Sequence, residues 1–221
     1  MFEFFSGFDH SVASAVHGFA TATGGNLNRF FYFFSLLGFK ALPIFFAAIV
    51  LMLFRKTRKT GTTAFIAIAI GAIITNLILK NVVFRARPFA DITSDYHVWW
   101  EYAGAVAQDG SSFPSGHSTA SMAFALAFFL TTNKKYSWAI FFFPLVMGLS
   151  RIYLNVHYAS DVLFGFISGA VGATISFFLT DFIYKLMLKK PDVKLFRFYF
   201  DFTITAPFTK KEKEPTDEEQ N

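Results

Sequence analysis

Long apolar segments alternate with short polar ones along most of the chain. A helix that crosses a bilayer needs about 20 mostly apolar residues. Five segments reach or approach that length, at about 30–54, 62–84, 117–132, 136–153 and 158–188. The third is short, so we expect its start to lie within the membrane boundary. No strand-like alternation competes with this pattern, which predicts an all-α, polytopic transmembrane helical bundle of about five spans.

The two ends of the chain depart from this pattern. Residues 1–25 contain Asp9, His10 and His17 and are too polar to cross a bilayer. They also lack the basic start of a signal peptide, so we expect a helix that lies in the membrane interface. Residues 206–221 are charged and contain proline, which predicts a disordered cytoplasmic tail. Residues 1–205 should form a single membrane-embedded domain.

The composition agrees with a membrane protein. Of the 221 residues, 54% are hydrophobic and 16% are charged, whereas a soluble domain carries roughly a quarter charged residues. The net charge of +5 could suit a nucleic acid. We expect no nucleic-acid partner, because the basic residues occur where a membrane protein carries them. The chain has no cysteine, which excludes disulfides, thiolate metal sites and a cysteine nucleophile.

Basic residues also predict the orientation of the spans. Lysine and arginine are enriched in short cytoplasmic loops. In a five-span arrangement the basic groups at 55–59, 134–135 and 189–197 all fall on one side. That side should be cytoplasmic, so the N-terminus and the loop from Arg85 to Gly116 should face outward. The pattern predicts a multi-pass cell-membrane protein.

Three polar clusters lie at the outward ends of these spans. Ionisable groups near membrane spans are costly and suggest function by default. The first cluster closes the second span with Lys80, Arg87 and Pro88. On a helix, Lys80 and Arg87 would share a face about 10 Å apart along the axis, and Pro88 would end the helix. The alternative is two cations that merely extend to the interface.

The second cluster opens the third span with Pro114, Ser115, Gly116 and His117. Such residues before an apolar run are typical of a helix start, whose free N–H groups bind anions. Ser115 can add a hydroxyl donor, Gly116 allows close approach of an oxyanion, and His117 can donate a proton. The alternative is an ordinary capped helix.

The third cluster contains Ser150, Arg151, His157 and Asp161. His157 and Asp161 would be neighbours on a helix. The carboxylate could then accept the Nδ1 proton of the imidazole and leave Nε2 free to attack. We expect a turn near 154–156, with Arg151 ending the fourth span and His157 beginning the fifth. A purely structural His–Asp pair is the alternative.

Together the clusters supply three cations, an N–H nest, two imidazoles and a carboxylate at one membrane face. This set suits a tetrahedral phosphate dianion, because guanidinium and ammonium groups bind phosphoryl oxygens and stabilise their charge during transfer.

The clusters resemble the three signature motifs of the type 2 phosphatidic acid phosphatase family, which also includes vanadium-dependent haloperoxidases. The resemblance implies a metal-independent phosphatase without a cofactor. It implies that His157 is the nucleophile and forms a phosphohistidine, that His117 serves as acid and then base, and that Asp161 orients His157. It assigns the phosphoryl oxygens to Lys80, Arg87, Ser115, Gly116 and Arg151. The matching stretches are Lys80-x6-Arg87-Pro88, Pro114-Ser115-Gly116-His117 and Ser150-Arg151-x5-His157-x3-Asp161.

A site at the membrane surface suits a lipid whose tail is buried and whose phosphate is at the surface. In that family such lipids are phosphatidic acid, phosphatidylglycerophosphate and polyprenyl diphosphates such as undecaprenyl diphosphate. The alternatives are a lipid-phosphate phosphotransferase, a non-hydrolytic anion or lipid transporter, and a haloperoxidase.

Other notable features have structural explanations. We expect the aromatic loop 89–112 to anchor in the interface, with a lid as the alternative. Lys40, inside the first span, should extend to the interface or contact a neighbouring span. The small residues Gly165, Gly169 and Ala173 should serve internal helix packing, and Asp181 should pair with Lys185.

Overall fold

The structure is a computed structural model that describes residues 2–204. Every regular element in this part of the chain is a helix, which confirms the predicted all-α class. The predicted tail, 206–221, lies outside the described residues. The α-helices are α1 (Glu3–Ala22), α2 (Asn28–Leu36), α3 (Leu42–Met52), α4 (Arg58–Ala72), α5 (Lys80–Val82), α6 (Asp95–Tyr102), α7 (Gly116–Thr131), α8 (Lys134–Ser137), α9 (Phe142–Tyr153), α10 (Ala159–Leu188) and α11 (Lys194–Asp201).

Four short segments of other helical types lie between these helices in the described chain. Two of them lie inside long apolar stretches: η1 between α2 and α3, and the π-helix η2 between α4 and α5. A π-helical segment inside a longer helix frequently marks a functional site. The segments are η1 (Phe39–Ala41), η2 (Ile73–Leu79), η3 (Pro88–Ala90) and η4 (Trp138–Phe141).

Three helical stretches in the described chain are long and apolar enough to cross a membrane: Asn28–Met52, Arg58–Val82 and Ala159–Leu188. They match the first, second and fifth predicted spans. The other two predicted spans correspond to α7 and to the run from α8 through α9. With 16 residues, α7 extends over about 24 Å, less than a hydrocarbon core of about 30 Å.

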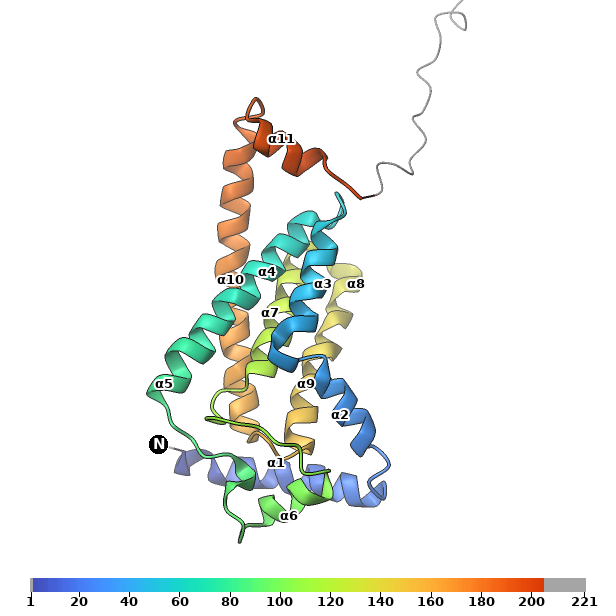
Figure 1. The fold of residues 1–221 in the computed structure, drawn as a ribbon, viewed down its shortest axis with the longest axis vertical. Helices are drawn as coiled ribbons and strands as arrows, with labels where there is room; N and C mark the ends of the chain where they lie inside the picture. Colours follow the sequence, from blue (N-terminus) through green and yellow to red (C-terminus); the bar gives the residue numbers. More distant parts are fainter. Residues whose placement is uncertain (1, 205–221) are drawn as a thin grey trace, which may run out of the picture.

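The bundle depends on close contact between α10 and its neighbours α7 and α4, which run beside it (Figure 1). A Cβ atom on Gly169 would lie 2.4 Å from the carbonyl oxygen of Thr119 in α7. A Cβ on Gly172 would lie 2.8 Å from that of Ala67 in α4. Gly165 is equally confined, and Ala173 is fully buried. The predicted role of these small residues in internal packing is therefore confirmed.

The two ends of the bundle differ. α1 lies across one end with α6 beside it, whereas the α3–α4 turn, α8 and α11 lie toward the other end (Figure 1). The three basic groups predicted to share a side therefore share an end of the bundle. At that end Asp181 pairs with Lys185, with 2.7 Å between Oδ2 and Nζ, as predicted. Asp181 also binds Lys59 at 2.8 Å.

The prediction that one helix carries both Lys80 and Arg87 is wrong. The helix ends at Val82, and residues 83–87 are not helical, with extended backbone angles at Val83 and Arg87. The carbonyl oxygen of Arg85 accepts from the backbone N–H of Ser112 at 2.9 Å, so bonds to the 111–112 segment replace helical ones. Arg87 also precedes a proline, which disfavours helical angles there, and its φ and ψ are −74° and 155°.

Substituting Gly169→Ala tests the packing of α10. The added methyl group would meet the backbone of α7, so we expect a loss of about 1–3 kcal/mol of stability. The measurement is the thermal unfolding midpoint of the purified protein. Gly18→Ala is the matched control, because a Cβ at Gly18 of α1 meets nothing within 4 Å. Equal midpoints for the two variants would contradict this account of the helix contact.

Candidate active site

A cavity of about 490 Å³ brings the three polar clusters together. One part of its wall is apolar, with side chains from α3, α4 and α7, including Phe45, Ile68 and Ala120. The other part is polar and mainly cationic, with Lys40, Lys80 and Arg87 beside one carboxylate, Asp109. Five of the predicted site residues line it, namely Lys80, Arg87, Gly116, His117 and His157. A cavity with one charged and one apolar wall fits a ligand that is itself amphipathic.

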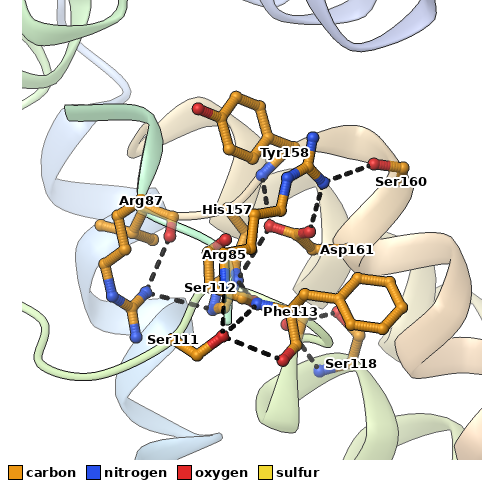
Figure 2. A network of polar contacts seen from close by, with 12 residues as sticks. Arg85, Arg87, Ser111, Ser112, Phe113, Ser118, His157, Tyr158, Ser160 and Asp161 are labelled. Carbon is orange, nitrogen blue, oxygen red and sulfur yellow. Dashed lines mark hydrogen bonds and ion pairs between the residues drawn. The ribbon is translucent and has the colours of Figure 1, made fainter. Parts of the chain in front are cut away.

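His157 lies in the turn between α9 and α10, as the sequence predicts for this stretch, though just before α10 rather than within it. Asn155 reverses the chain there with a φ of 49°. The imidazole is buried, and its Nδ1 lies 2.7 Å from the carbonyl oxygen of Ser112 (Figure 2). A carbonyl can only accept, so Nδ1 carries the proton and Nε2 keeps its lone pair.

Asp161, the predicted partner of Nδ1, lies farther away, with its Oδ2 at 3.6 Å. Its Oδ2 accepts the backbone N–H of Tyr158 at 3.0 Å and so caps α10. The nearest acceptor for His157 is thus a main-chain oxygen. Sequence reasoning missed it, because the side chain of Ser112 carries no signal for a contact that its backbone makes.

The surroundings of His157 keep the ring neutral. Burial lowers the pKa of His157 to about 4, and the positive charges of Arg151 and Arg87 act in the same direction. The interaction with Asp161 opposes them. Near neutral pH the ring is therefore neutral, with its one proton on Nδ1, and its Nε2 is available as a nucleophile.

Arg87 is held beside that nitrogen by main-chain oxygens. Its Nη1 donates to the carbonyl of Val156 at 2.8 Å, and its Nη2 donates to that of Asp109 at 2.7 Å. Nη1 lies 3.5 Å from Nε2 of His157. The guanidinium is thus fixed in place without a carboxylate of its own, and its charge stays available to an anion in the cavity.

Arg151 is fully buried at the end of α9 and does not reach the cavity lining. One terminal nitrogen donates to the hydroxyl of Ser35, while Nε and Nη2 have no hydrogen-bond partner. Its positive charge nevertheless interacts electrostatically with Lys80 and His117. Leaving N–H groups of a buried guanidinium unpaired is costly, so this edge of Arg151 favours an oxyanion ligand.

The start of α7 supplies backbone donors. Ser115 is the N-cap residue, and its Oγ accepts from the hydroxyl of Ser118 at 2.9 Å and from the backbone N–H of Ser118. The backbone N–H of Ser115 donates to the carbonyl of Asp161 at 3.0 Å. Gly116 and His117 are the first residues of the helix, where N–H groups have no intrahelical acceptor. These two donors are therefore the available part of the nest, and Ser115 serves to shape it.

Arg85 and Asp9 form a second layer behind the site. The Arg85 guanidinium binds Oδ1 of Asp161 at 2.6 Å and stacks on the ring of Tyr158 (Figure 2). It also binds Oδ2 of Asp9 at 2.7 Å. Asp9 also accepts from the backbone N–H of Ser160 at 2.7 Å. This network joins α1 to the start of α10. It also gives Asp161 a cationic partner that lies outside the cavity.

Sequence reasoning missed this layer, although one signal was present. Asp9 lies on the same face of α1 as the buried residues Ala13 and Ala20, at helical spacing. A carboxylate on the apolar face of an amphipathic helix requires a buried partner. The residue that supplies it, Arg85, is adjacent in sequence to the motif cation Arg87 but has a different task. Within residues 2–204, no three His, Asp or Glu side chains gather in a way that could hold a metal ion.

The chain is similar in sequence to a known family and to named relatives. The model of the PAP2 superfamily matches residues 60–185. Undecaprenyl-diphosphatase BcrC of Bacillus subtilis is 27% identical over 210 residues, which is 95% of this chain and 98% of that protein. A lipid A 1-phosphatase of Rhizobium johnstonii is 36% identical over 112 residues, 50% of this chain and 43% of that protein. The chain thus spans nearly all of the first relative and less than half of the second.

Two solved structures share the fold. The crystal structure of Aquifex aeolicus LpxE aligns with a TM-score of 0.57 and 26% identity, covering 68% of this chain and 84% of that one. A transmembrane PAP2-type phosphatidylglycerolphosphate phosphatase from Bacillus subtilis aligns with a TM-score of 0.51 and 24% identity, covering 80% and 87%. At 24% identity, the similarity to the second structure shows only that the fold is shared.

The protonation of His157 can be measured directly. We expect its ring to stay neutral near pH 5.5, where a histidine with an ordinary pKa of about 6.5 is mostly protonated. The measurement is an NMR titration of ring-labelled histidines, with His157→Gln identifying the signal. Protonation of His157 at an ordinary pKa would mean that the ring is solvated and not held as the structure describes.

Proposed function

The chain belongs to the PAP2 superfamily, and from that premise we propose that it is an integral membrane lipid phosphatase. It hydrolyses a phosphate or diphosphate monoester of a lipid and releases inorganic phosphate without a metal ion. The single observation that carries the proposal is the buried, neutral His157, whose free Nε2 faces the guanidinium of Arg87 in a cavity with an apolar wall. Its matched relatives are named as lipid phosphatases.

The reaction follows from these positions. Nε2 of His157 attacks phosphorus in line, and the bond from phosphorus to the lipid oxygen breaks as the new N–P bond forms. His117, on the same cavity, donates a proton to the departing oxygen and then withdraws one from the water that cleaves the phosphohistidine. The phosphoryl oxygens are bound by Lys80, Arg87 and the first turn of α7 at Gly116, which Ser115 caps. Arg151 lies behind this lining and acts on them through its positive charge.

Asp161 acts on His157 as a positioning residue together with the Ser112 carbonyl. During attack the imidazole becomes positively charged, and the Asp161 carboxylate at 3.6 Å stabilises that charge. Arg85 holds the carboxylate in place from the opposite side. The oxygen of Ser112 alone can fix the tautomer, so the task that remains for Asp161 is mainly electrostatic.

Among lipid phosphates, undecaprenyl diphosphate is the favoured substrate. The relative that matches over nearly the full length of both chains is named an undecaprenyl-diphosphatase. Relatives that match over shorter stretches carry other substrates in their names, including lipid A and phosphatidylglycerophosphate. Phosphatidylglycerophosphate and phosphatidic acid are therefore the comparison substrates.

In the membrane, the bundle crosses five times and α1 lies in the interface. The three apolar stretches already identified are joined by α7 and by the run from α8 through α9, which pack between them. The end with the basic α3–α4 turn, α8 and α11 faces the cytoplasm. The cavity lies toward the opposite end, so the site faces the extracytoplasmic side of the cell membrane.

Removing the nucleophile tests the reaction. His157→Ala should lower phosphate release by at least about 10⁴-fold, because the group that forms the covalent intermediate is lost. The assay is phosphate release from undecaprenyl diphosphate, phosphatidylglycerophosphate and phosphatidic acid in parallel, with product analysis to detect transfer to an acceptor other than water. His10→Ala on α1 is the control. Retained turnover in the His157 variant would overturn the assignment.

The Arg85 network provides a matched pair of variants. Asp161→Asn and Asp9→Asn each remove one of the two carboxylates that bind Arg85, so both should destabilise the protein. Only Asp161→Asn should greatly lower kcat, with KM little changed. The Ser112 carbonyl preserves the tautomer, so the loss should stay well below the about 10⁴-fold typical of catalytic triads. Equal kcat values for the two variants would assign Asp161 a structural role only.

A further inference from the structure

The first long apolar stretch is broken at the level of the cavity. α2 ends at Leu36 and α3 begins at Leu42, with η1 between them. Within η1, Lys40 has a φ of 48°, and Ala41 follows with a φ of 58°. Two consecutive non-glycine residues with left-handed backbone angles are uncommon and persist only where the surroundings hold them.

The surroundings of this break are the active site itself. A Cβ atom on Gly38 would lie 2.3 Å from Cδ2 of His117, so the backbone at Gly38 packs directly against the His117 imidazole. The four residues 38–41 all line the cavity. The break therefore holds Lys40 at the same cavity as the cations of the motifs, though from a different helix.

Lys40, an exposed residue, brings a positive charge into an apolar stretch, and the carboxylate Asp109 that lines the same cavity forms no ion pair with it. No carboxylate in residues 2–204 forms an ion pair with it, and the contact found for its Nζ is the ring of Phe39, 5.5 Å from the centroid. It neither contacts a neighbouring span through an ion pair nor belongs to any of the three motifs. An unpaired ammonium group inside a membrane span is costly unless an anion comes to it.

The same cavity also carries neutral hydrogen-bonding groups. Gln108, from the loop before α7, lines it beside the carboxylate Asp109. Asn76, from the π-helix η2, lines it near the first turn of α7, with its Oδ1 3.8 Å from the position of a Cβ on Gly116. Amide and ammonium donors suit phosphate oxygens. The motif cations and the first turn of α7 already serve the phosphoryl group at His157. An additional cation with amide donors thus indicates room for additional negative charge on the ligand.

We propose that Lys40 is the cation of a second phosphate subsite, which binds the lipid-side phosphate of a lipid diphosphate while the terminal phosphate lies at His157. This proposal rests on the proposed function and narrows its substrate class. When Nε2 of His157 bonds to the terminal phosphorus, the bond to the bridging oxygen breaks. That oxygen keeps the electron pair and takes the proton of His117, so a lipid monophosphate departs. Lys40 stabilises the charge of this leaving group.

A lipid monophosphate has no second phosphate to reach Lys40, and this difference is the basis of the test. The substrates are undecaprenyl diphosphate and undecaprenyl phosphate, which share one tail. The variants are Lys40→Met, which keeps the unbranched chain but removes the charge, and Lys40→Arg, which keeps the charge. Lys56→Met, in the exposed turn between α3 and α4, is the matched control. The measured quantity is kcat/KM of each purified protein for each lipid.

We expect Lys40→Met to lower kcat/KM for the diphosphate by about tenfold or more, the effect of one charged hydrogen bond, and to change the value for the monophosphate by less than about twofold. Lys40→Arg should retain most of the preference for the diphosphate. Lys56→Met should give the same kcat/KM values as the unchanged protein. Equal losses on both lipids, or no loss on either, would overturn the proposal.

Inhibition of the unchanged protein gives a second measurement that does not depend on a variant folding. Inorganic pyrophosphate can occupy both subsites, so it should inhibit monophosphate hydrolysis at about tenfold lower concentration than inorganic phosphate. Equal inhibition by the two anions would also overturn the second subsite. If the unchanged protein releases phosphate from neither lipid, the proposed function itself fails, an outcome distinct from a loss of diphosphate preference.

Discussion

Uncompensated positive charge at one end of an apolar bundle is the constraint on which the rest of the structure depends. Arg87, Arg151 and Lys80 form no ion pair with a carboxylate in the described chain, although burial makes a free charge expensive. The buried carboxylate Asp161 is bound by Arg85, and the exposed Asp109 is the carboxylate found in the cavity lining of the described chain. The cations of the site therefore outnumber its carboxylates, and a phosphate dianion supplies the missing negative charge. Binding of the substrate and stabilisation of the transition state therefore depend on the same uncompensated positive charge.

Helix packing keeps this charged cavity in a fixed shape. Glycines along α10 allow the backbones of α4 and α7 to approach closely, and this contact aligns the start of α7 with the start of α10. The bond between the Ser115 N–H and the Asp161 carbonyl joins those two helix starts directly. α1 then closes the end of the bundle through Asp9 and Arg85. The distances around His157 thus follow from apolar contacts far from the charge as much as from polar contacts near it.

Much of the site could be predicted because its chemistry depends on side chains at fixed spacing. Lys80, Arg87, Gly116, His117 and His157 were predicted to share one site and do line one cavity, and the turn before His157 was predicted correctly. The helical course through Arg87 was not, because long-range bonds from Ser111 and Ser112 outweigh local helix propensity. Ser112 and Arg85 were missed for the same reason, since their partners lie far away in sequence. Lys40 was visible as an anomaly, but only the three-dimensional arrangement shows that it lines the cavity.

The bond from His157 to a main-chain carbonyl also affects how the protein can change over time. A side-chain acceptor can be lost by a single substitution, but every residue type at position 112 provides the same oxygen. Substitutions at position 112 therefore leave the orientation of the attacking nitrogen unchanged, provided that the backbone conformation is kept. Variation can then accumulate around the pocket and alter which lipid is accepted, while the reacting atom keeps its orientation.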